Sequence, residues 1–170
     1  MKIAIFKIPF IIISLLSLDT FCQSANLLTQ EITDMKYMLE EEKVARDVYE
    51  FLDTKWHMRV FNNIKQSEQR HMDMMENLLN TNKVVYELHD EEGKFYNEDL
   101  QTMYNNLIEK GSKSKYDALE VGKMIEVVDI EDLEKAIKKT SKSDISDVYS
   151  QLIFASNNHL RAFNRNLSRF

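Results

Sequence analysis

Two imidazoles and four carboxylates lie at positions where the helical pattern of this sequence calls for core residues. These residues are Glu42, Glu68, His71, Glu126, Asp129 and His159. Ionisable side chains in a buried helical seam are costly unless they are paired or bind a metal ion. Carboxylates and imidazoles together suit iron, manganese or zinc. The sequence therefore predicts a buried metal site assembled from several helices.

The strongest local signal is a Glu-Gln-Arg-His motif at residues 68–71. Residues three apart on a helix project to nearly the same side, so Glu68 and His71 can hold a single ion. Such a pair alone is a weak motif, because it occurs by chance in many helices. Its position within an apolar stripe makes it more specific. Glu126 and Asp129 repeat the three-residue spacing further along the chain.

The elements that must position these residues follow from four stripes with alternating spacings of three and four, typical of helices packed in a bundle. The stripes are Met35, Met38, Glu42, Ala45, Tyr49, Leu52, Trp56; Phe61, Ile64, Glu68, His71, Met75, Leu78; Leu119, Gly122, Glu126, Asp129, Leu133, Ala136; and Ile145, Val148, Leu152, Ala155, His159, Ala162. Only three glycines and one proline occur in 170 residues, which also favours long helices. The predicted fold class is therefore all-α.

We expect four main helices at about residues 28–55, 60–80, 113–139 and 145–168, with Asp144 capping the last one. The long connection between the second and third is expected to contain a short helix at 97–110. Two helical hairpins joined by one long crossover predict an antiparallel four-helix bundle of the ferritin-like arrangement. Residues 25–170 are expected to form this single domain.

Hairpin geometry predicts that the polar core residues meet. Glu42 and His71 are equidistant from the turn expected near Trp56, and Glu126 and His159 are equidistant from the turn expected near Lys142. Each pair should therefore lie roughly 22–25 Å from its turn, at 1.5 Å per residue. The two half-sites can then face each other in the middle of the bundle.

Charge sets the expected number of ions. The four carboxylates carry four negative charges, and none of the stripes contains Lys or Arg. Two divalent cations would balance this charge, whereas a site without cations should take up protons. Oxygen-rich ligation with two imidazoles favours iron or manganese, and zinc is not excluded.

Residues 1–24 have the features of a secretory signal, with Lys2 before an apolar run and a small polar segment at its end. The sequence around Asp19 and Phe21 is atypical of a cleavage region, so a retained membrane anchor is the alternative. The mature protein is expected to be exported, in a periplasm or outside the cell. No later segment is apolar enough to span a bilayer.

Cys22 is the only cysteine, and we expect it to leave with the signal; a lipid anchor through Cys22 is the alternative. The folded part can then have no internal disulfide, cysteine-rich zinc site or iron–sulfur cluster. Removing residues 1–24 changes the net charge from −6 to −7. Such an acidic chain is a poor partner for nucleic acid, and the Arg161, Arg165, Arg169 stripe is expected to be a solvated face.

The chain from about residue 35 to 163 resembles the ferritin-like di-iron superfamily. Residues 42–49 are similar to the first ligand-bearing helix of rubrerythrins, and residues 67–71 to the second. More closely, segments within 41–49, 67–73, 125–133 and 158–163 resemble a prokaryotic ferritin-like family, domain of unknown function 2202. The resemblance implies a four-helix metal-binding fold, with the ligands Glu42, Glu68, His71, Glu126 and His159. It implies no substrate.

The sequence departs from the superfamily pattern at Ser156, where a Glu is expected. Asp129 and Ser156 are equidistant from the second turn, so we hypothesise that Asp129 supplies the missing carboxylate. Tyr49 lies one heptad from Glu42 and is either a plain core residue or a hydrogen-bonding or redox partner of the site. Glu40, Glu41 and Glu120 fall off the stripes and are expected to be solvated.

Two classes of function remain open. The first is a di-iron oxidoreductase, of peroxidase or ferroxidase type, acting on oxygen, peroxide or ferrous iron with an external electron donor. Electron delivery through a rubredoxin-type domain is excluded by the lack of cysteines. The second is a metal-binding or structural helical bundle without turnover. Assembly into oligomers is compatible with both.

Overall fold

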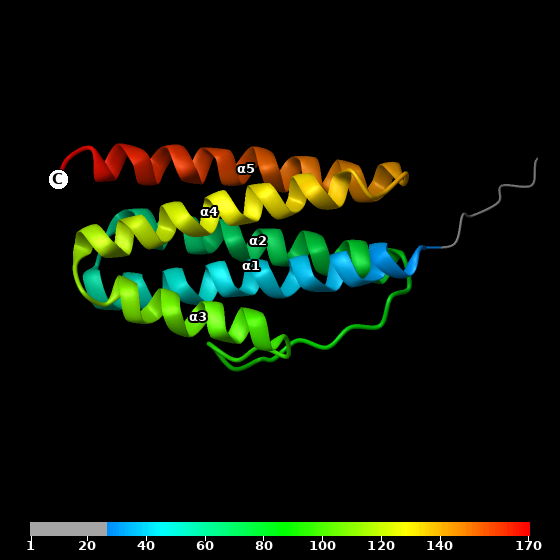
Figure 1. Ribbon diagram of the computed structural model, residues 1–170, viewed down its shortest axis with the longest axis horizontal. Helices are drawn as coiled ribbons and strands as arrows, with labels where there is room; N and C mark the ends of the chain where they lie inside the picture. The colour runs from blue at the N-terminus through cyan, green and yellow to red at the C-terminus, as the bar shows by residue number, and fades with distance from the viewer. Residues whose placement is uncertain (1–26) are drawn as a thin grey trace, which may run out of the picture.

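The computed structural model describes residues 27–170, so the expected signal segment and Cys22 lie outside the described residues. This part contains five helices and no strand, which confirms the all-α prediction. The helices are α1 (Thr29–Trp56), α2 (Arg59–Thr81), α3 (Glu98–Gly111), α4 (Lys115–Ile137) and α5 (Ser143–Leu167) (Figure 1). Within residues 27–170, none of them combines the length and apolarity needed to cross a membrane.

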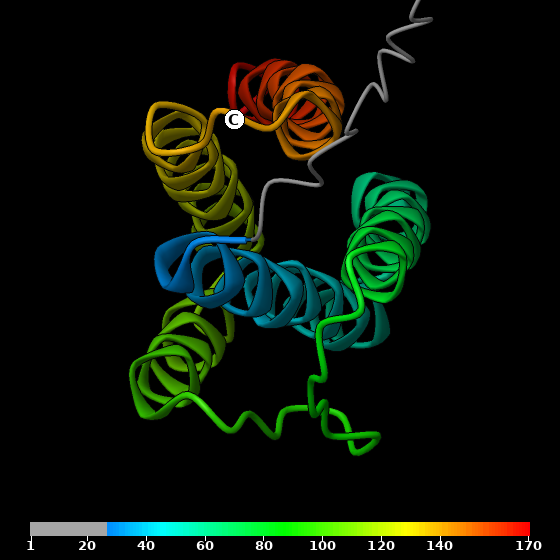
Figure 2. The same ribbon diagram turned by 90° about the vertical axis from the view of Figure 1, so that its right-hand side faces the viewer.

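The four long helices pack as two adjacent pairs. α1 packs mainly on α2, and α4 mainly on α5, while smaller contacts join α1 to α4 and α2 to α5. Viewed from the end in Figure 2, α3 lies outside the long helices, where it contacts α1 and α4. The long connection at residues 82–97 runs from the end of α2 to the start of α3. This order matches the predicted sequence of hairpin, crossover and hairpin.

Short-range chemistry explains where the helices begin and end. His57 adopts a left-handed conformation (φ 50°) after α1, and its N–H donates to Asp53 O, so the chain reverses at the predicted turn. Asn97 and Ser114 cap α3 and α4 with their side chains. The predicted capping role of Asp144 is wrong: α5 begins at Ser143, so Asp144 lies in its first turn and accepts a hydrogen bond from Asn82.

α1 is the most enclosed helix, because α2, α3, α4 and the crossover all contact it. Residues 38–45 are buried without interruption, so the helix has no solvated face along this stretch. The prediction that Glu40 and Glu41 are solvated is therefore wrong: they are 7% and 5% exposed. The pattern analysis assumed one buried stripe per helix, and that assumption fails for a helix surrounded by four neighbours.

The buried stripe of α5 also differs from the prediction. Tyr149, Ser156 and Phe163 are buried, whereas the adjacent Val148, Ala155 and Ala162 are only half-buried. The larger rings face inward because there is space for them: the ring of Phe163 lies against Gly122 and within 5.4 Å of the ring centroid of Tyr49. The sequence pattern could not distinguish these two faces of α5, because both carry apolar residues: Val148, Ala155 and Ala162 on one, and Tyr149 and Phe163 on the other.

Gly122→Ala should destabilise the protein, because a Cβ at this position would overlap the ring of Phe163. Phe163 packs against Tyr49 and Phe61, so its ring cannot move aside without disturbing them. Overpacking of this kind costs about 1–3 kcal/mol. Chemical denaturation should show the loss, and the double substitution Gly122→Ala with Phe163→Leu should recover part of it. An unchanged unfolding midpoint in the single variant would show that the close approach is not required.

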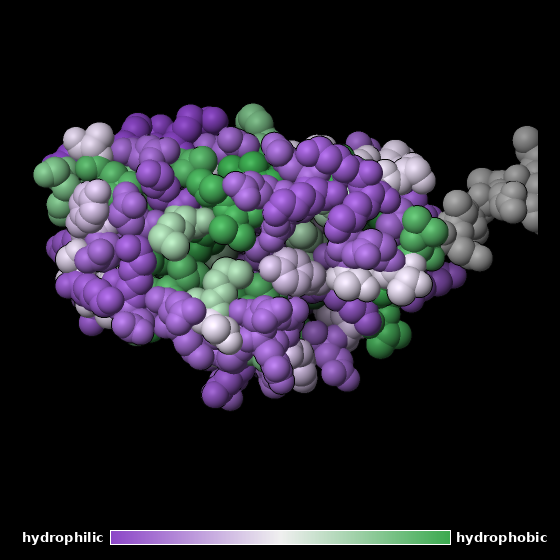
Figure 3. Space-filling view, viewed as in Figure 1, coloured by the Kyte–Doolittle hydropathy of each residue, from purple (hydrophilic) through white to green (hydrophobic). Residues whose placement is uncertain are grey.

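The face seen in Figure 3 is mainly hydrophilic, as expected for the outer surfaces of amphipathic helices. Apolar side chains nevertheless gather along α4 in this view, and the exposed apolar residues of α4 include Met124, Val127 and Val128. Arg161, Arg165 and Arg169 are exposed, which confirms the prediction that they form a solvated face.

Candidate metal centre

Glu68 is the point at which the two halves of the predicted site meet. Its Oε2 atom lies 2.8 Å from His71 Nδ1, and its Oε1 atom lies 2.9 Å from His159 Nδ1. His71 is one turn further along α2, whereas His159 comes from α5. A single carboxylate thus contacts two imidazoles from different helices, one with each oxygen.

Each imidazole also contacts a second carboxylate. Glu42 Oε2 on α1 lies 3.1 Å from His71 Nδ1, and Glu126 Oε2 on α4 lies 3.4 Å from His159 Nδ1. The predicted hairpin levels are therefore correct: residues equidistant from each turn meet across their helix pair. The two imidazole rings are stacked with their centroids 5.4 Å apart.

These contacts form two sets of three side chains that could each hold a metal ion. One set is Glu42, Glu68 and His71, and the other is Glu68, Glu126 and His159. In each set the ligand atoms all lie within 4.8 Å of one another, and all five residues are buried. Three protein ligands leave coordination positions open for water or substrate.

Several buried atoms in these sets are not used in hydrogen bonds. Among residues 27–170, Glu42 Oε1, Glu68 Oε1 and His159 Nδ1 have no hydrogen-bond partner. Glu68 Oε1 and His159 Nδ1 are close in distance, but their alignment is not that of a hydrogen bond. Buried nitrogen and oxygen atoms that converge without well-aligned hydrogen bonds are the arrangement expected for ligands of a shared ion, so the residues fit a metal ion.

Protons balance the charge of the metal-free protein. Burial opposes the charged form of His71, but Glu42 and Glu68 outweigh it and raise the pKa of this imidazole to about 11. Burial likewise opposes the charge of His159, and Glu126 and Glu68 raise its pKa to about 9. The two imidazoles in turn outweigh the burial of Glu68 and lower its pKa to about 2. Metal binding would displace these protons, as it does from histidine ligands generally.

The pKa values of the other carboxyl groups, those of Glu42, Glu126 and Asp129, are raised, whereas that of Glu68 is lowered. Burial is the largest cause that raises the pKa of Glu42 and of Glu126 to about 7. Burial, followed by the charges of Glu42 and Glu41, raises the pKa of Asp129 well above its usual value. The site therefore holds more carboxylates than its two imidazoles can compensate, and cations would relieve this excess.

Tyr49 hydrogen-bonds to one of the candidate ligands. Its hydroxyl donates to Glu126 Oε1 at 2.6 Å and is 3.3 Å from Gly122 O. Burial and then the charge of Glu126 raise the pKa of this phenol, so it remains a proton donor. Of the two interpretations left open by the sequence, the hydrogen-bonding one fits the geometry, and Tyr49 orients Glu126 as outer residues orient metal ligands elsewhere.

Asp129 lies beside the two sets rather than within either. It lines a small cavity together with Glu41, Glu42, Glu68 and Glu126. Ser156 is near enough to lower the pKa of this carboxyl group, although burial raises it more, so these two residues are at one level, as predicted from the second turn. The Ser156 hydroxyl itself donates to Leu152 O, within its own helix. α5 therefore contributes the imidazole of His159 to the centre. The carboxylate of Asp129, from α4, lies next to Ser156, where the superfamily pattern has a Glu.

Glu41, which the helical periodicity did not mark as a site residue, has a carboxyl group that lines the same cavity. Burial, Asp132 and Glu42 raise its pKa to about 8. The available signal was the run of three acids at residues 40–42 in the middle of a helix, which is unusual where neighbouring positions are apolar. His57 and His89, to which no role was assigned, lie away from the centre, in the first turn and in the crossover.

Comparisons with known proteins agree with the fold. The chain is 48% identical over 134 residues to the protein described as uncharacterized protein MJ0754 of Methanocaldococcus jannaschii, a match covering 78% of this chain and 72% of the relative. The crystal structure of MJ0754 superposes with a TM-score of 0.83 at 45% identity, covering 84% of this chain and 82% of that one. A DUF305 fragment from Deinococcus radiodurans superposes with a TM-score of 0.67 at 13% identity, covering 84% of this chain and 98% of the fragment, which shows a shared fold alone.

The family profile gives the same result over a longer stretch of the chain. The profile described as uncharacterized protein domain (DUF2202) matches residues 31–169, a range that includes all five helices except the first two residues of α1. That range also contains every residue of the candidate centre. Together with the 48% identity to MJ0754, this match shows that the chain belongs to the DUF2202 family.

Proposed function

We propose that the protein is a ferritin-like di-metal carboxylate protein that binds two divalent cations between its four long helices. Glu42, Glu68 and His71 hold one cation, and Glu68, Glu126 and His159 hold the second. The observation that carries this proposal is the position of Glu68, whose two oxygens each approach a different imidazole. Asp129 acts as the additional carboxylate in place of the Glu that α5 lacks at Ser156.

Charge supports two cations rather than one. Within residues 27–170, the basic partners of Glu42, Glu68 and Glu126 are His71 and His159 rather than Lys or Arg. Once the imidazoles are neutral ligands, the carboxylates retain their negative charge in a buried environment. Two divalent ions compensate it, which a single ion would not. Iron is the metal we expect, with manganese or zinc as alternatives suited to the same ligands.

We further propose that the loaded protein is an oxidoreductase acting on oxygen, peroxide or ferrous iron. Bound iron would supply the electrons for such chemistry. The protein contributes a centre enclosed by apolar side chains, a carboxylate held by Tyr49, and a cavity of about 10 Å³ for a water-sized sphere. That space is close to the minimum for one water molecule, so it admits only very small reactants.

A metal-binding protein without turnover is the second candidate, and the burial of the ligands favours it. All five residues of the two ligand sets are at most 9% exposed, so a substrate has little access to the ions that they would hold. Anaerobic loading with ferrous iron, followed by oxygen or peroxide, separates the two candidates. Consumption of the oxidant with more than one turnover per centre supports the oxidoreductase, whereas inert binding supports the structural role.

Metal loading should raise the melting temperature of the full chain. A ligand at about a thousand times its dissociation constant stabilises the native state by about 4 kcal/mol per site. For a domain of this size, 4 kcal/mol corresponds to about 10 °C, so two filled sites should raise the melting temperature by about 20 °C. Calorimetry with ferrous iron or manganese should show the rise, EDTA should reverse it, and elemental analysis should give two ions per chain. A protein that melts at the same temperature with and without metal would contradict the proposal.

We also propose that the protein is exported and that residues 1–24 are removed. The support is the basic start and apolar run of that segment. Mass spectrometry of the protein from its own host should detect a chain that begins near residue 25. A full-length chain in the cytoplasmic fraction would contradict export, and a lipid-modified Cys22 would support the anchored alternative.

A further inference from the structure

Glu41 is a buried acid outside the two ligand sets. It is 5% exposed, and within residues 27–170 neither of its carboxylate oxygens has a hydrogen-bond partner. The basic residue that acts on it is Lys135, which is exposed and pairs with Asp132 at 2.7 Å. Burying a carboxyl group without a partner costs free energy, so Glu41 does not stabilise the fold through any contact of its own.

The Glu41 side chain lies in the cavity that borders the candidate centre. Glu42 and Asp129 line the same cavity, and its other walls include Met103 of α3 and Val128 of α4. Val128 is 37% exposed, so the cavity is close to the protein surface on this side. Its accessible volume of about 10 Å³ suits one dehydrated cation and excludes larger ligands.

A further carboxylate, that of Asp132, acts on Glu41. Asp132 and Glu42 are the acidic charges that act most strongly on it. Asp132 is half-buried and pairs with the exposed Lys135, whereas Glu42 is buried in the centre. Asp132 lines an open groove of about 260 Å³ between α1 and α4, together with Asp34. Lys135 and Lys139 pair with these two acids at the surface, and such exposed pairs are weak enough to exchange.

We propose that Glu41, together with Asp129 at the edge of the Glu/His centre, forms a transient cation site through which divalent ions pass from the Asp132 groove to that centre. Asp129 is then shared by the transfer site and the centre, whose cavity it lines together with Glu41 and Glu42. This inference rests on the proposed function, because it requires that the centre itself binds cations. Oxygen ligands from Glu41 and Asp129 suit a hard divalent cation. Their smaller number and the lack of an imidazole make this site weaker than the centre, as a transfer site must be.

The test is the rate of metal uptake by the full-length metal-free protein. Stopped-flow absorbance with Co²⁺ should show that Glu41→Gln loads about tenfold more slowly than the unchanged protein, because Gln cannot give up a proton to form the carboxylate that the passing cation would bind. The final stoichiometry and affinity should stay within about twofold. Glu41→Asp, which keeps the carboxylate, should load faster than Glu41→Gln. Glu134→Gln is the matched control, because it removes the same charge from an exposed position on α4.

The outcomes separate this inference from the proposed function. If the unchanged protein loads with Co²⁺ and Glu41→Gln loads equally fast, the transfer site is wrong and the centre stands. If Glu41→Gln instead loses as much equilibrium affinity as Glu42→Gln, Glu41 is a ligand of the centre and the transfer role is likewise wrong. If the unchanged protein takes up no Co²⁺, Mn²⁺ or Fe²⁺, the centre and the transfer site are both wrong.

Discussion

Glu68→Gln should abolish binding at both cation sites, whereas Glu42→Gln and Glu126→Gln should each weaken only one. Glu68 belongs to both ligand sets, and its two oxygens lie 2.8 and 2.9 Å from His71 and His159. Removing one member of a buried charged pair costs about 3–5 kcal/mol. That cost corresponds to a loss of roughly 140- to 4,000-fold in affinity at each site. The neutral amide keeps the volume of the side chain, so the packing around it is preserved.

Isothermal titration and elemental analysis after desalting measure this effect directly. Glu109→Gln is the control, since it removes one charge from an exposed position on α3 whose recorded ion pair, with Lys113, is long at 3.5 Å. Circular dichroism should show that all variants remain helical. Retention of two tightly bound ions by Glu68→Gln, or loss of only one, would show that Glu68 is not shared between the sites.

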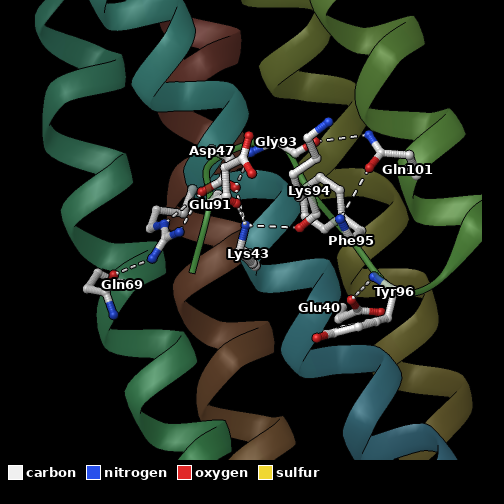
Figure 4. Close-up of polar contacts among 11 residues, drawn as sticks. Glu40, Lys43, Asp47, Gln69, Glu91, Gly93, Lys94, Phe95, Tyr96 and Gln101 are labelled. Carbon is white, nitrogen blue, oxygen red and sulfur yellow. Dashed lines mark hydrogen bonds and ion pairs between the residues drawn. The ribbon is translucent and has the colours of Figure 1, made fainter. Parts of the chain in front are cut away.

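Lys43→Met should destabilise the protein by about 1.5–3 kcal/mol, because it removes the buried donor shared by Asp47 and two crossover carbonyl oxygens, while Asp47 keeps its contact with Arg46 at 2.6 Å. Lys43 is 1% exposed, and its Nζ donates to Asp47 Oδ2 at 2.6 Å. The same ammonium group donates to the carbonyl oxygens of Glu91 and Lys94 in the crossover, as Figure 4 shows. Asp47 in turn accepts from the N–H of Gly93. The Lys43–Asp47 pair thus fastens the crossover to α1.

Denaturant unfolding tests this prediction, and Lys65→Met is its control. Lys65 also pairs with two acids, Glu50 and Asp53, but these pairs are partly exposed and should contribute no more than about 1 kcal/mol. The double variant Lys43→Met with Asp47→Asn should lose less stability than the two single variants together, since the two side chains interact directly. Equal losses for Lys43→Met and Lys65→Met would show that the buried pair has no special role.

Docking of the crossover also matters for the centre. Glu40 accepts hydrogen bonds from the N–H groups of Tyr96 and Asn97, one turn before Lys43 on the same side of α1. These contacts cover the part of α1 that carries Glu41 and Glu42 on its other faces. We expect these contacts between the crossover and α1 to prevent α1 from rotating about its axis. The Glu42 carboxylate then stays against His71.

Much of the candidate site could be predicted from periodicity. The motif at residues 68–71 places Glu68 and His71 on one helix face whatever the rest of the fold does, because a helix repeats every 3.6 residues. Hairpin geometry then brings Glu42 to His71 and Glu126 to His159, since the turns fix which residues are level. The structure contains both contacts, Glu42 with His71 and Glu126 with His159.

Other features depend on neighbours that a sequence pattern does not represent. Which face of α5 is buried depends on the space that Gly122 leaves for Phe163 on a different helix. The hydrogen bond from Tyr49 to Glu126 joins residues 77 positions apart. Whether Asp129 stands beside Ser156 depends on how α4 and α5 are rotated, not only on their levels.

By itself, the sequence determined the helical class, the two turns and the set of acids and imidazoles available for a buried site, because these follow from local periodicity and composition. Tertiary structure alone decided that Glu68 contacts both imidazoles and that α1 is enclosed on all sides along residues 38–45. It also decided that Glu41 lies in a cavity beside the centre instead of in solvent. The physical reason is that burial depends on how many helices surround a residue, and the sequence pattern of one helix reports only its own apolar face.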